Sequence, residues 1–201
     1  MSMGGTAAYA GVEGLPEPVE RAVRLATGRG FAHSCRPEQG RLLAALAGGA
    51  AGVIGETGTG CGVGLAWLAS AAPPGARLVS VERDPDLAAA VGRLFGADDR
   101  VTVECGDWRE IAGHAPFDLL VLDGGGSGKA PGDEPADPEA LLAPEGTVVV
   151  DDFTPGRPGP DPAREHWLGH PALRAVELRL AADLSSVVGV RRSRVGQGGD
   201  Q

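Results

Sequence analysis

The chain has 201 residues, a net charge of −9 and three scattered cysteines. This length suffices for one α/β domain, and the acidic charge argues against a nucleic acid or an anionic membrane as partner, because either would require a basic face. No apolar run is long enough to span a membrane, the N-terminus lacks a signal-peptide pattern, and the cysteines lack metal-ligand spacing, so we expect a reduced, cytoplasmic protein.

Residues 1–14 are rich in glycine and alanine without apolar periodicity, so we expect a flexible N-terminus. A single domain is predicted over 15–192, followed by a disordered tail at 193–201. Two helices, over 16–27 and 37–47, precede the first strand. The predicted strands are 52–56, 77–82, 100–104, 117–123, 146–152, 173–180 and 185–192. The predicted helices among them are 63–71, 84–95, 108–112, 135–142 and 161–168.

The order of these elements predicts the fold class. Strands separated by helices of this size imply a parallel sheet with right-handed crossovers and helices on both faces. Only residues 181–184 separate the last two strands, which is too short for a crossover helix, so one of these strands runs antiparallel. We therefore expect an α/β fold with a central, mostly parallel seven-stranded sheet and a C-terminal antiparallel hairpin.

The first strand leads into a loop in which Gly58, Gly60 and Gly62 alternate with other residues, and Glu56 stands two places before them. Glycines let the backbone approach a ligand closely, and the helix that begins at Val63 attracts a negative group such as a carboxylate. The Glu56 carboxylate would instead repel a pyrophosphate and attract a positive group. A ligand with both signs is S-adenosylmethionine (SAM), which has an ammonium, a carboxylate and a sulfonium.

The run E-T-G-T-G-C-G at 56–62 resembles motif I of the class I SAM-dependent methyltransferases, E/D-x-G-x-G-x-G. The resemblance implies a Rossmann-like class I methyltransferase fold, with SAM bound by Glu56, Thr57 and the three glycines. A nicotinamide oxidoreductase is the main alternative. It would need G-x-G-x-x-G, but Val63 or Leu65 stands where the last glycine belongs, and its sheet would continue with a parallel strand.

Two further strand ends provide candidate cofactor contacts. Glu82 ends the second strand, where a carboxylate can accept both ribose hydroxyls, and we include its neighbour Arg83 in the cofactor site. The third strand leads into Gly106, Asp107 and Trp108. In the family, an acid here accepts a hydrogen bond from the adenine amino group while apolar neighbours enclose the ring. Asp107 as a helix N-cap and Trp108 as a cover for the sheet edge are the alternative interpretations.

Acidic residues also follow the fourth and fifth strands. Asp123, Asp151 and Asp152 would converge at adjacent strand ends, and their repulsion favours a bound cation; oxygen ligands point to Mg²⁺ or Ca²⁺. These positions resemble the metal ligands of catechol-type and bacterial small-molecule O-methyltransferases. The resemblance covers 31–192, and it implies that Ser34 borders the cofactor pocket.

The chain departs from that family at two places. The lysine expected a few residues after the fourth-strand acid stands six residues on, at Lys129, which is the only lysine in the chain. Asp152 stands where the best-known members have asparagine. Two interpretations therefore stay open: a metal site, or a metal-free pocket in which Asp123 binds the SAM ammonium or the substrate. Our candidate catalytic residues are Asp123, Lys129 and His166, and without a metal a protein base is needed.

From these residues we expect an enzyme that transfers a methyl group from SAM to a hydroxyl of a small molecule, assisted by a divalent cation. The alternatives are a metal-independent N- or O-methyltransferase of a natural-product intermediate and a non-catalytic SAM-binding protein. Relatives are often dimers that use their N-terminal helices, so the resemblance also suggests a homodimer. The acceptor itself cannot be identified from the sequence.

Overall fold

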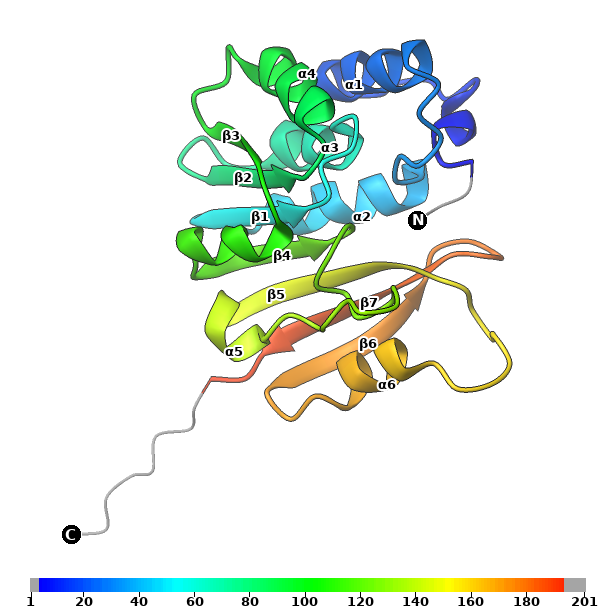
Figure 1. Ribbon diagram of the computed structural model, residues 1–201, viewed down its shortest axis with the longest axis vertical. Coiled ribbons are helices and arrows are strands. Elements are labelled where there is room, and N and C mark those ends of the chain that lie inside the picture. Colours follow the sequence, from blue (N-terminus) through cyan, green and yellow to red (C-terminus); the bar gives the residue numbers. More distant parts are fainter. Residues whose placement is uncertain (1–3, 194–201) are drawn as a thin grey trace, which may run out of the picture.

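The computed structural model describes residues 4–193, which form one seven-stranded sheet with helices on both faces (Figure 1). The helices are α1 (Glu17–Gly28), α2 (Pro37–Ala47), α3 (Val63–Ala71), α4 (Pro85–Phe95), α5 (Pro138–Leu141) and α6 (Pro162–Gly169), with 3-10 helices η1 (Thr6–Tyr9) and η2 (Trp108–His114). The strands are β1 (Val53–Thr57), β2 (Arg77–Glu82), β3 (Val101–Cys105), β4 (Phe117–Leu122), β5 (Leu142–Phe153), β6 (Leu173–Arg179) and β7 (Ser185–Arg191).

The strand order is β3-β2-β1-β4-β5-β7-β6. Strands β1 to β5 pair in parallel, while β7 runs antiparallel to both of its neighbours, β5 and β6. This arrangement confirms the predicted mostly parallel sheet with a C-terminal hairpin. Strands β1 and β4 are parallel neighbours, but β2 and β3 follow on one side of β1 while β4 and β5 lie on the other. The carboxyl ends of β1 and β4 therefore border the crevice in which such sheets bind ligands.

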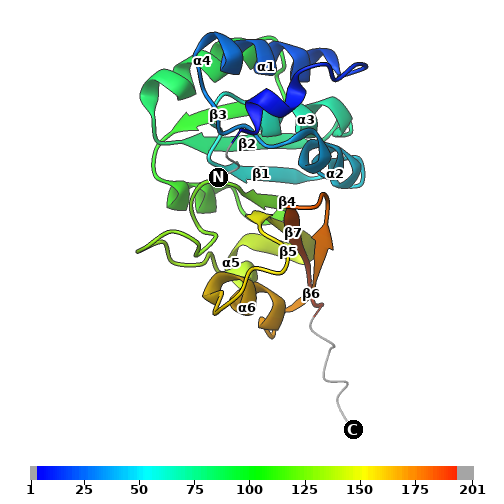
Figure 2. The same ribbon diagram turned by 90° about the vertical axis from the view of Figure 1, so that its right-hand side faces the viewer.

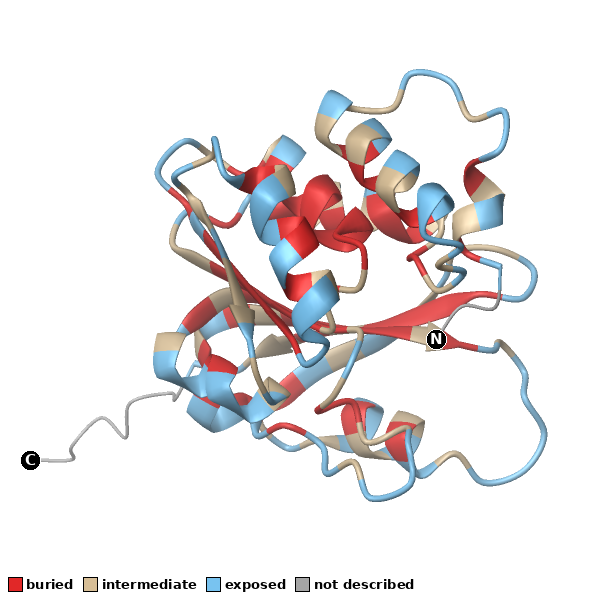
Figure 3. Ribbon diagram, turned by 45° about the horizontal axis from the view of Figure 1, so that its top comes forward, coloured by how far each residue is buried: buried red, intermediate tan, exposed pale blue. Residues whose placement is uncertain are grey.

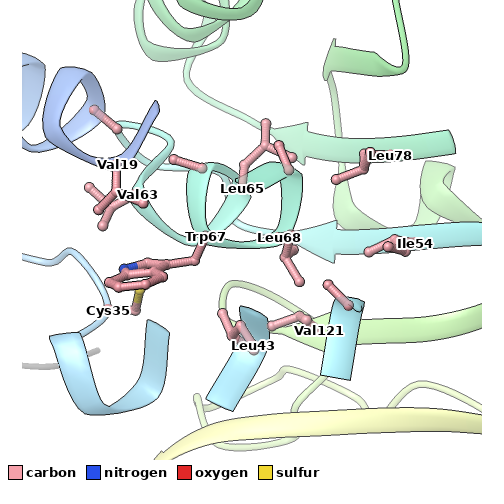
Figure 4. Packing of buried hydrophobic residues seen from close by; sticks show 14 of the residues in the cluster. Val19, Cys35, Leu43, Ile54, Val63, Leu65, Trp67, Leu68, Leu78 and Val121 are labelled. Carbon is pink, nitrogen blue, oxygen red and sulfur yellow. The ribbon is translucent and has the colours of Figure 1, made fainter. Parts of the chain in front are cut away.

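Alternating side chains of the central strands supply two cores, one on each face of the sheet. Helices α1 to α4 cover one face, where Leu119 and Val121 of β4 join the cluster around α3. Figure 4 shows Trp67, Leu68 and Leu65 of α3 within this cluster. Elements η2, α5 and α6 cover the other face. Figure 2 shows the two layers on opposite sides of the sheet, and Figure 3 shows that the central strands are largely buried.

Helix α5 and strand β5 differ from the prediction. The helix expected over 135–142 has only four residues, and the strand expected at 146–152 already begins at Leu142. Asp137 caps the helix by accepting a hydrogen bond from the amide of Glu139, but Leu142 then pairs with Phe117 of β4. Pairing with the sheet therefore overrides the local helical pattern.

The N-terminal segment also differs from the expected flexible stretch over 1–14. Tyr9 is only 5% exposed; its hydroxyl donates to the main-chain oxygen of Cys35 and accepts from the Trp67 indole. These two buried hydrogen bonds anchor η1 against α3. The predicted tail lies outside the described residues, apart from Ser193, and the domain boundaries stay a prediction. Within 4–193 we find no helix that is both long and apolar enough to cross a membrane.

Candidate functional site

The loop after β1 depends on glycine at each of its alternating positions. Gly58, Gly60 and Gly62 have φ angles of 81°, 54° and 81°, a left-handed conformation that side chains disfavour. Gly58 also crosses the loop after β4 in backbone contact, because a Cβ on Gly58 would lie 2.5 Å from Cα of Gly124. The backbone therefore carries no side chains where the carboxyl ends of β1 and β4 meet, so a ligand can approach it closely.

Glu56 lies beneath this loop, with 1% of its surface exposed. Its carboxylate accepts a hydrogen bond from Ser80 of β2 at 2.6 Å, and Ser80 in turn bonds Thr59 in the loop. Burial raises the pKa of Glu56 from its usual 4.5 to about 8, while the Ser80 hydrogen bond lowers it and the charge of Asp151 raises it. An ammonium bound nearby would favour the ionised form.

Two neighbours fix the position of Glu56 and the strand around it. A Cβ at Gly64, in the first turn of α3, would overlap the Glu56 carboxylate, so a glycine there makes room for the acid. Thr57 is fully buried, and its hydroxyl donates to the main-chain oxygen of Gly125 at 2.8 Å. Thr57 thus joins the loop after β1 to the loop after β4 and has no exposed surface for direct ligand contact.

Glu82 joins the glycine loop to the end of β2. One carboxylate oxygen accepts from the amide of Gly60 at 2.8 Å, and the other accepts from the amide of Asp84 at 2.9 Å. Glu82 is 8% exposed, whereas its neighbour Arg83 is exposed. Each carboxylate oxygen has a further lone pair, so these backbone bonds orient the acid and leave it able to accept from a ligand hydroxyl.

The segment after β3 lies against the loop after β4. Asp107 is exposed and caps η2 by accepting from the amide of Arg109 at 3.0 Å, which agrees with the N-cap interpretation. The Trp108 ring packs on Gly125 and Gly126, where a Cβ would collide with it. Gly106, just before Asp107, likewise leaves no room for a Cβ beside Glu110 of the capping box.

Ser34 is held by the N-terminal segment. Its hydroxyl lies 2.8 Å from that of Thr6, which also donates to the main-chain oxygen of Phe31. The Phe31 ring lies against Gly60, since a Cβ at Gly60 would come within 2.9 Å of it. The segment before α2 therefore does border the glycine loop, but through Phe31, while the Ser34 side chain bonds away from it.

The three acids after β4 and within β5 converge. One carboxylate oxygen from each of Asp123, Asp151 and Asp152 lies within 4.8 Å of the others. Consecutive residues of a regular strand point to opposite faces. Here the register of β5 shifts between Val150 and Phe153, and Asp152 has a φ of 54°, so both acids reach the same cluster. Burial is the main cause that raises the pKa values of Asp123 and Asp151.

Lys129 reaches this acid cluster of Asp123, Asp151 and Asp152 from the loop after β4. Its ammonium lies 3.3 Å from a carboxylate oxygen of Asp151 and also donates to the main-chain oxygen of that residue. The ammonium is 5.2 Å from the centroid of the Phe153 ring. The six-residue spacing that separates Lys129 from Asp123 in sequence therefore still brings the lysine to the acids.

The loop that carries Lys129 is fixed at two points. The Asp133 carboxylate accepts from the amides of Gly126 and Gly128, each at 2.8 Å. The Trp167 indole of α6 donates to the main-chain oxygen of Ser127 at 2.8 Å, in a buried hydrogen bond. These contacts order the glycine-rich loop at 124–129, which we call the lysine loop, and thereby position Lys129.

His166 does not join the acids. Its ring lies on α6 with its centroid 5.2 Å from those of Trp167 and His170. Its Nε2 is buried without a hydrogen-bond partner among residues 4–193, and burial, together with His170, lowers its pKa. Of the three candidate catalytic residues, the structure thus brings together Asp123 and Lys129 and leaves His166 apart.

Several polar contacts that fix buried side chains or loops were not identified from the sequence. Ser80 bonds Glu56, Asp133 organises the lysine loop, and Gln39 of α2 accepts a buried hydrogen bond from Ser186 of β7. The role of Ser80 could have been suspected from the sequence, because it is a polar residue inside the apolar run of β2. No sequence pattern indicates the contacts of Asp133 or the Gln39–Ser186 hydrogen bond, because the fold determines which residues meet.

We expect Trp167→Phe to weaken the lysine loop. The change keeps the aromatic volume but removes the donor to Ser127, so a buried carbonyl loses its partner at a cost of about 1–3 kcal/mol. Trp67→Phe is the matched control, because its indole donates to Tyr9 on the opposite face of the sheet. Urea unfolding should show similar losses for both variants, and only Trp167→Phe should also reduce the methyl transfer that the sequence leads us to expect. Equal activity in the two variants would contradict this role of the loop.

Comparisons with known proteins give a consistent result. Residues 56–153 match the family model described as a methyltransferase domain. The chain is 37% identical over 78 residues to catechol O-methyltransferase B of Danio rerio, an alignment that covers 34% of this chain and 30% of that protein. The chain thus spans about a third of this curated relative's length.

Solved structures extend the likeness over nearly the whole chain. The O-methyltransferase TomG from Streptomyces achromogenes, in complex with SAM, has a TM-score of 0.68 and 21% identity, covering 93% of this chain and 95% of its own. An O-methyltransferase from Bacillus cereus, in complex with S-adenosylhomocysteine (SAH), has a TM-score of 0.70 and 19% identity, with 93% and 96% covered. Cofactor-bound Rv0187 from MTB has a TM-score of 0.74 and 23% identity, with 96% and 99% covered.

These findings confirm the predicted fold class and the resemblance that motif I indicated. The chain has the class I methyltransferase fold, and its residues 56–153 are similar to the methyltransferase domain family.

Proposed function

We propose that this methyltransferase-fold chain transfers a methyl group from SAM to a hydroxyl group of a small molecule. The observation that carries the proposal is the meeting of two sites at the carboxyl ends of β1, β2, β4 and β5. A glycine loop with Glu56 and Glu82 lies beside a partly buried cluster of acids with one lysine. The first suits a cofactor with charges of both signs, and the second suits a polar acceptor.

The cofactor would lie along the ends of β1 to β3. Glu82 would accept the ribose hydroxyls, since the backbone of the glycine loop already orients it. Asp107 and Trp108, with Arg83 nearby, would hold the adenine, and Glu56 would balance the SAM ammonium from beneath the loop. The N-terminus of α3 would attract the SAM carboxylate.

Methyl transfer from a sulfonium is an in-line displacement: the acceptor oxygen bonds the methyl carbon as the carbon–sulfur bond breaks, and the sulfonium becomes a neutral thioether. The protein must align the acceptor with the methyl group and remove the hydroxyl proton. Lys129 and Asp123 would bind and orient the acceptor hydroxyl, and the Asp123 carboxylate would accept its proton when no metal is bound. Phe153 and Trp167 would form the acceptor wall.

The acid cluster also fits a divalent cation. Its three carboxylates are oxygen donors that converge within 4.8 Å, which suits a hard ion such as Mg²⁺ or Ca²⁺. Asp123, Asp151 and Asp152 would hold the ion, which would lower the pKa of a bound acceptor hydroxyl. A metal-independent N- or O-methyltransferase is the second candidate, and the observation that favours it is the Lys129–Asp151 ion pair, which supplies positive charge without a metal.

The test is release of SAH from SAM with catechol and other small hydroxylated acceptors, run once with EDTA and once with excess Mg²⁺. We expect turnover of at least one acceptor, and stimulation by Mg²⁺ would favour the metal-assisted reaction. Binding of SAM without turnover of any acceptor would favour a non-catalytic SAM-binding protein. A cytoplasmic location, a homodimer and the absence of nucleic-acid and membrane partners stay predictions.

A further inference from the structure

The acid cluster concentrates negative charge in a partly buried place. Asp151 is 2% exposed, and Asp123 and Asp151 are close enough to share a hydrogen bond. Neighbouring carboxylates in a buried site repel one another unless a cation joins them or a proton is shared. Whatever positive charge lies against these acids therefore determines how readily another cation can enter.

The structure places an ammonium against the cluster. Lys129 contacts both the carboxylate and the main-chain oxygen of Asp151, and its side chain is 20% exposed. The Phe153 ring lies beside the same ammonium. Although the chain has 18 lysine and arginine residues, Lys129 is its only lysine. An ammonium is a compact charge on a flexible stem, so it can enter and leave a small acidic site more easily than a guanidinium.

Hydrogen bonds from two different segments fix the loop backbone that precedes Lys129. Asp133 fixes the amides of Gly126 and Gly128, and Trp167 fixes the carbonyl of Ser127. The backbone that leads to Lys129 is therefore anchored, while its side chain keeps rotatable bonds. The ion pair can break by rotation of the side chain alone, without unfolding the loop.

We propose that the Lys129 ammonium is the resident cation of the acid cluster, and that a divalent cation binds to these acids only by displacing it. The proposal deepens the proposed function, on which it rests, because it states how the same site exchanges one positive charge for another. With the ammonium of Lys129 on Asp151, part of the negative charge of the acid cluster is neutralised. The affinity of the cluster for a metal ion is therefore reduced. When a metal binds, the freed ammonium becomes available to the acceptor.

The single lysine allows a direct test on the unaltered protein. Lys129 and the N-terminal amine are the two amines of the chain, so an amine-reactive acylating reagent forms stable amides only there. Mass spectrometry separates these products from each other and from any adduct of the exposed Cys105 thiol. We expect acylation of Lys129 to be slow and to accelerate several-fold when Mg²⁺ or Mn²⁺ is added, because the ion pair protects the amine. The same reaction in EDTA is the control, since the rate at Lys129 should stay low without free metal. An unchanged or slower rate at Lys129 would overturn the proposal.

Calorimetric titration with Mn²⁺ provides the second test. Lys129→Met should bind the ion about tenfold more tightly than the original chain, because the competing charge is gone. Lys129→Gln repeats the change with a polar side chain. Arg157→Gln is the control, since it removes one positive charge from an exposed residue and should not alter the affinity. Equal or weaker binding by the Lys129 variants, or no binding by any protein, would overturn the proposal.

Titration of every protein with SAH distinguishes a failure of the cation exchange from a failure of the proposed function. If SAH binds and the metal affinity does not respond to Lys129, the exchange of cations is wrong and the proposed methyltransferase stands. If SAH does not bind to the original chain, the proposed function fails. SAH binding by the Lys129 variants also shows that they are folded.

Discussion

Gly58→Ala is expected to abolish binding of SAH and to destabilise the protein by about 2–5 kcal/mol. Two effects combine at this position. The φ of 81° is unfavourable for alanine, and the new Cβ would lie 2.5 Å from Cα and 2.6 Å from the amide nitrogen of Gly124. Neither backbone can move freely, because the amide of Gly58 donates to Val81 and the amide of Gly124 donates to Thr57. The loops after β1 and β4 must therefore move apart, which disrupts the cofactor site between them.

Gly14→Ala is the matched control for Gly58→Ala. Gly14 has a φ of 71°, but a Cβ added there would meet no atom within 4 Å, so the substitution reproduces the conformational strain without the collision. It should cost about 1–2 kcal/mol and leave SAH binding intact. Thermal unfolding and SAH titration of both variants measure the difference. Undiminished SAH binding by Gly58→Ala would show that the crossing of the two loops does not shape the cofactor site.

Glu56→Gln is expected to stabilise the protein and to weaken SAH binding. Because burial raises the pKa of Glu56 to about 8 from 4.5, the folded protein keeps a proton that the unfolded chain releases. The original chain therefore loses stability as the pH rises from 4.5 to 8, by about 1.4 kcal/mol per pH unit. The glutamine variant lacks this loss and can still accept from Ser80. Its advantage should be absent below pH 4.5 and largest above pH 8.

The measurement for Glu56→Gln is urea unfolding of both proteins between pH 4 and pH 9. Glu13→Gln, at an exposed position, is the control and should show no such pH-dependent difference. SAH titration of the same samples should show weaker binding by Glu56→Gln, since a neutral amide does not balance an ammonium. A variant whose advantage in stability is constant with pH would contradict the buried, protonated state of Glu56.

The sequence was sufficient to locate the site because its main groups follow strands. Parallel strands bring their carboxyl ends to one edge, so acids that end separate strands, such as Glu56, Glu82 and Asp123, could be expected to gather there. The glycine spacing identified the loop, and the short link between the last two strands predicted the hairpin. All of these are local patterns whose consequences follow from regular geometry.

The contacts that could not be predicted join segments far apart in the chain. Whether Asp151 and Asp152 point to the same side depends on a shift of register in β5, which the apolar pattern does not reveal. Tyr9 is anchored by Cys35 and Trp67, and Thr6 bonds Phe31 and Ser34, so two side chains fix a segment without apolar periodicity. A pattern of residue types does not contain such pairings, since tertiary packing determines them.

Calorimetric titration with SAH measures whether the glycine loop and Glu82 form a cofactor site. We predict saturable, one-to-one binding by the original chain, and binding weaker by about 10- to 100-fold in Glu82→Gln, which loses charge-assisted hydrogen bonds to the ribose. Arg157→Gln should bind as the original chain does. Absence of SAH binding by the original chain, or equal binding by Glu82→Gln, would contradict the account.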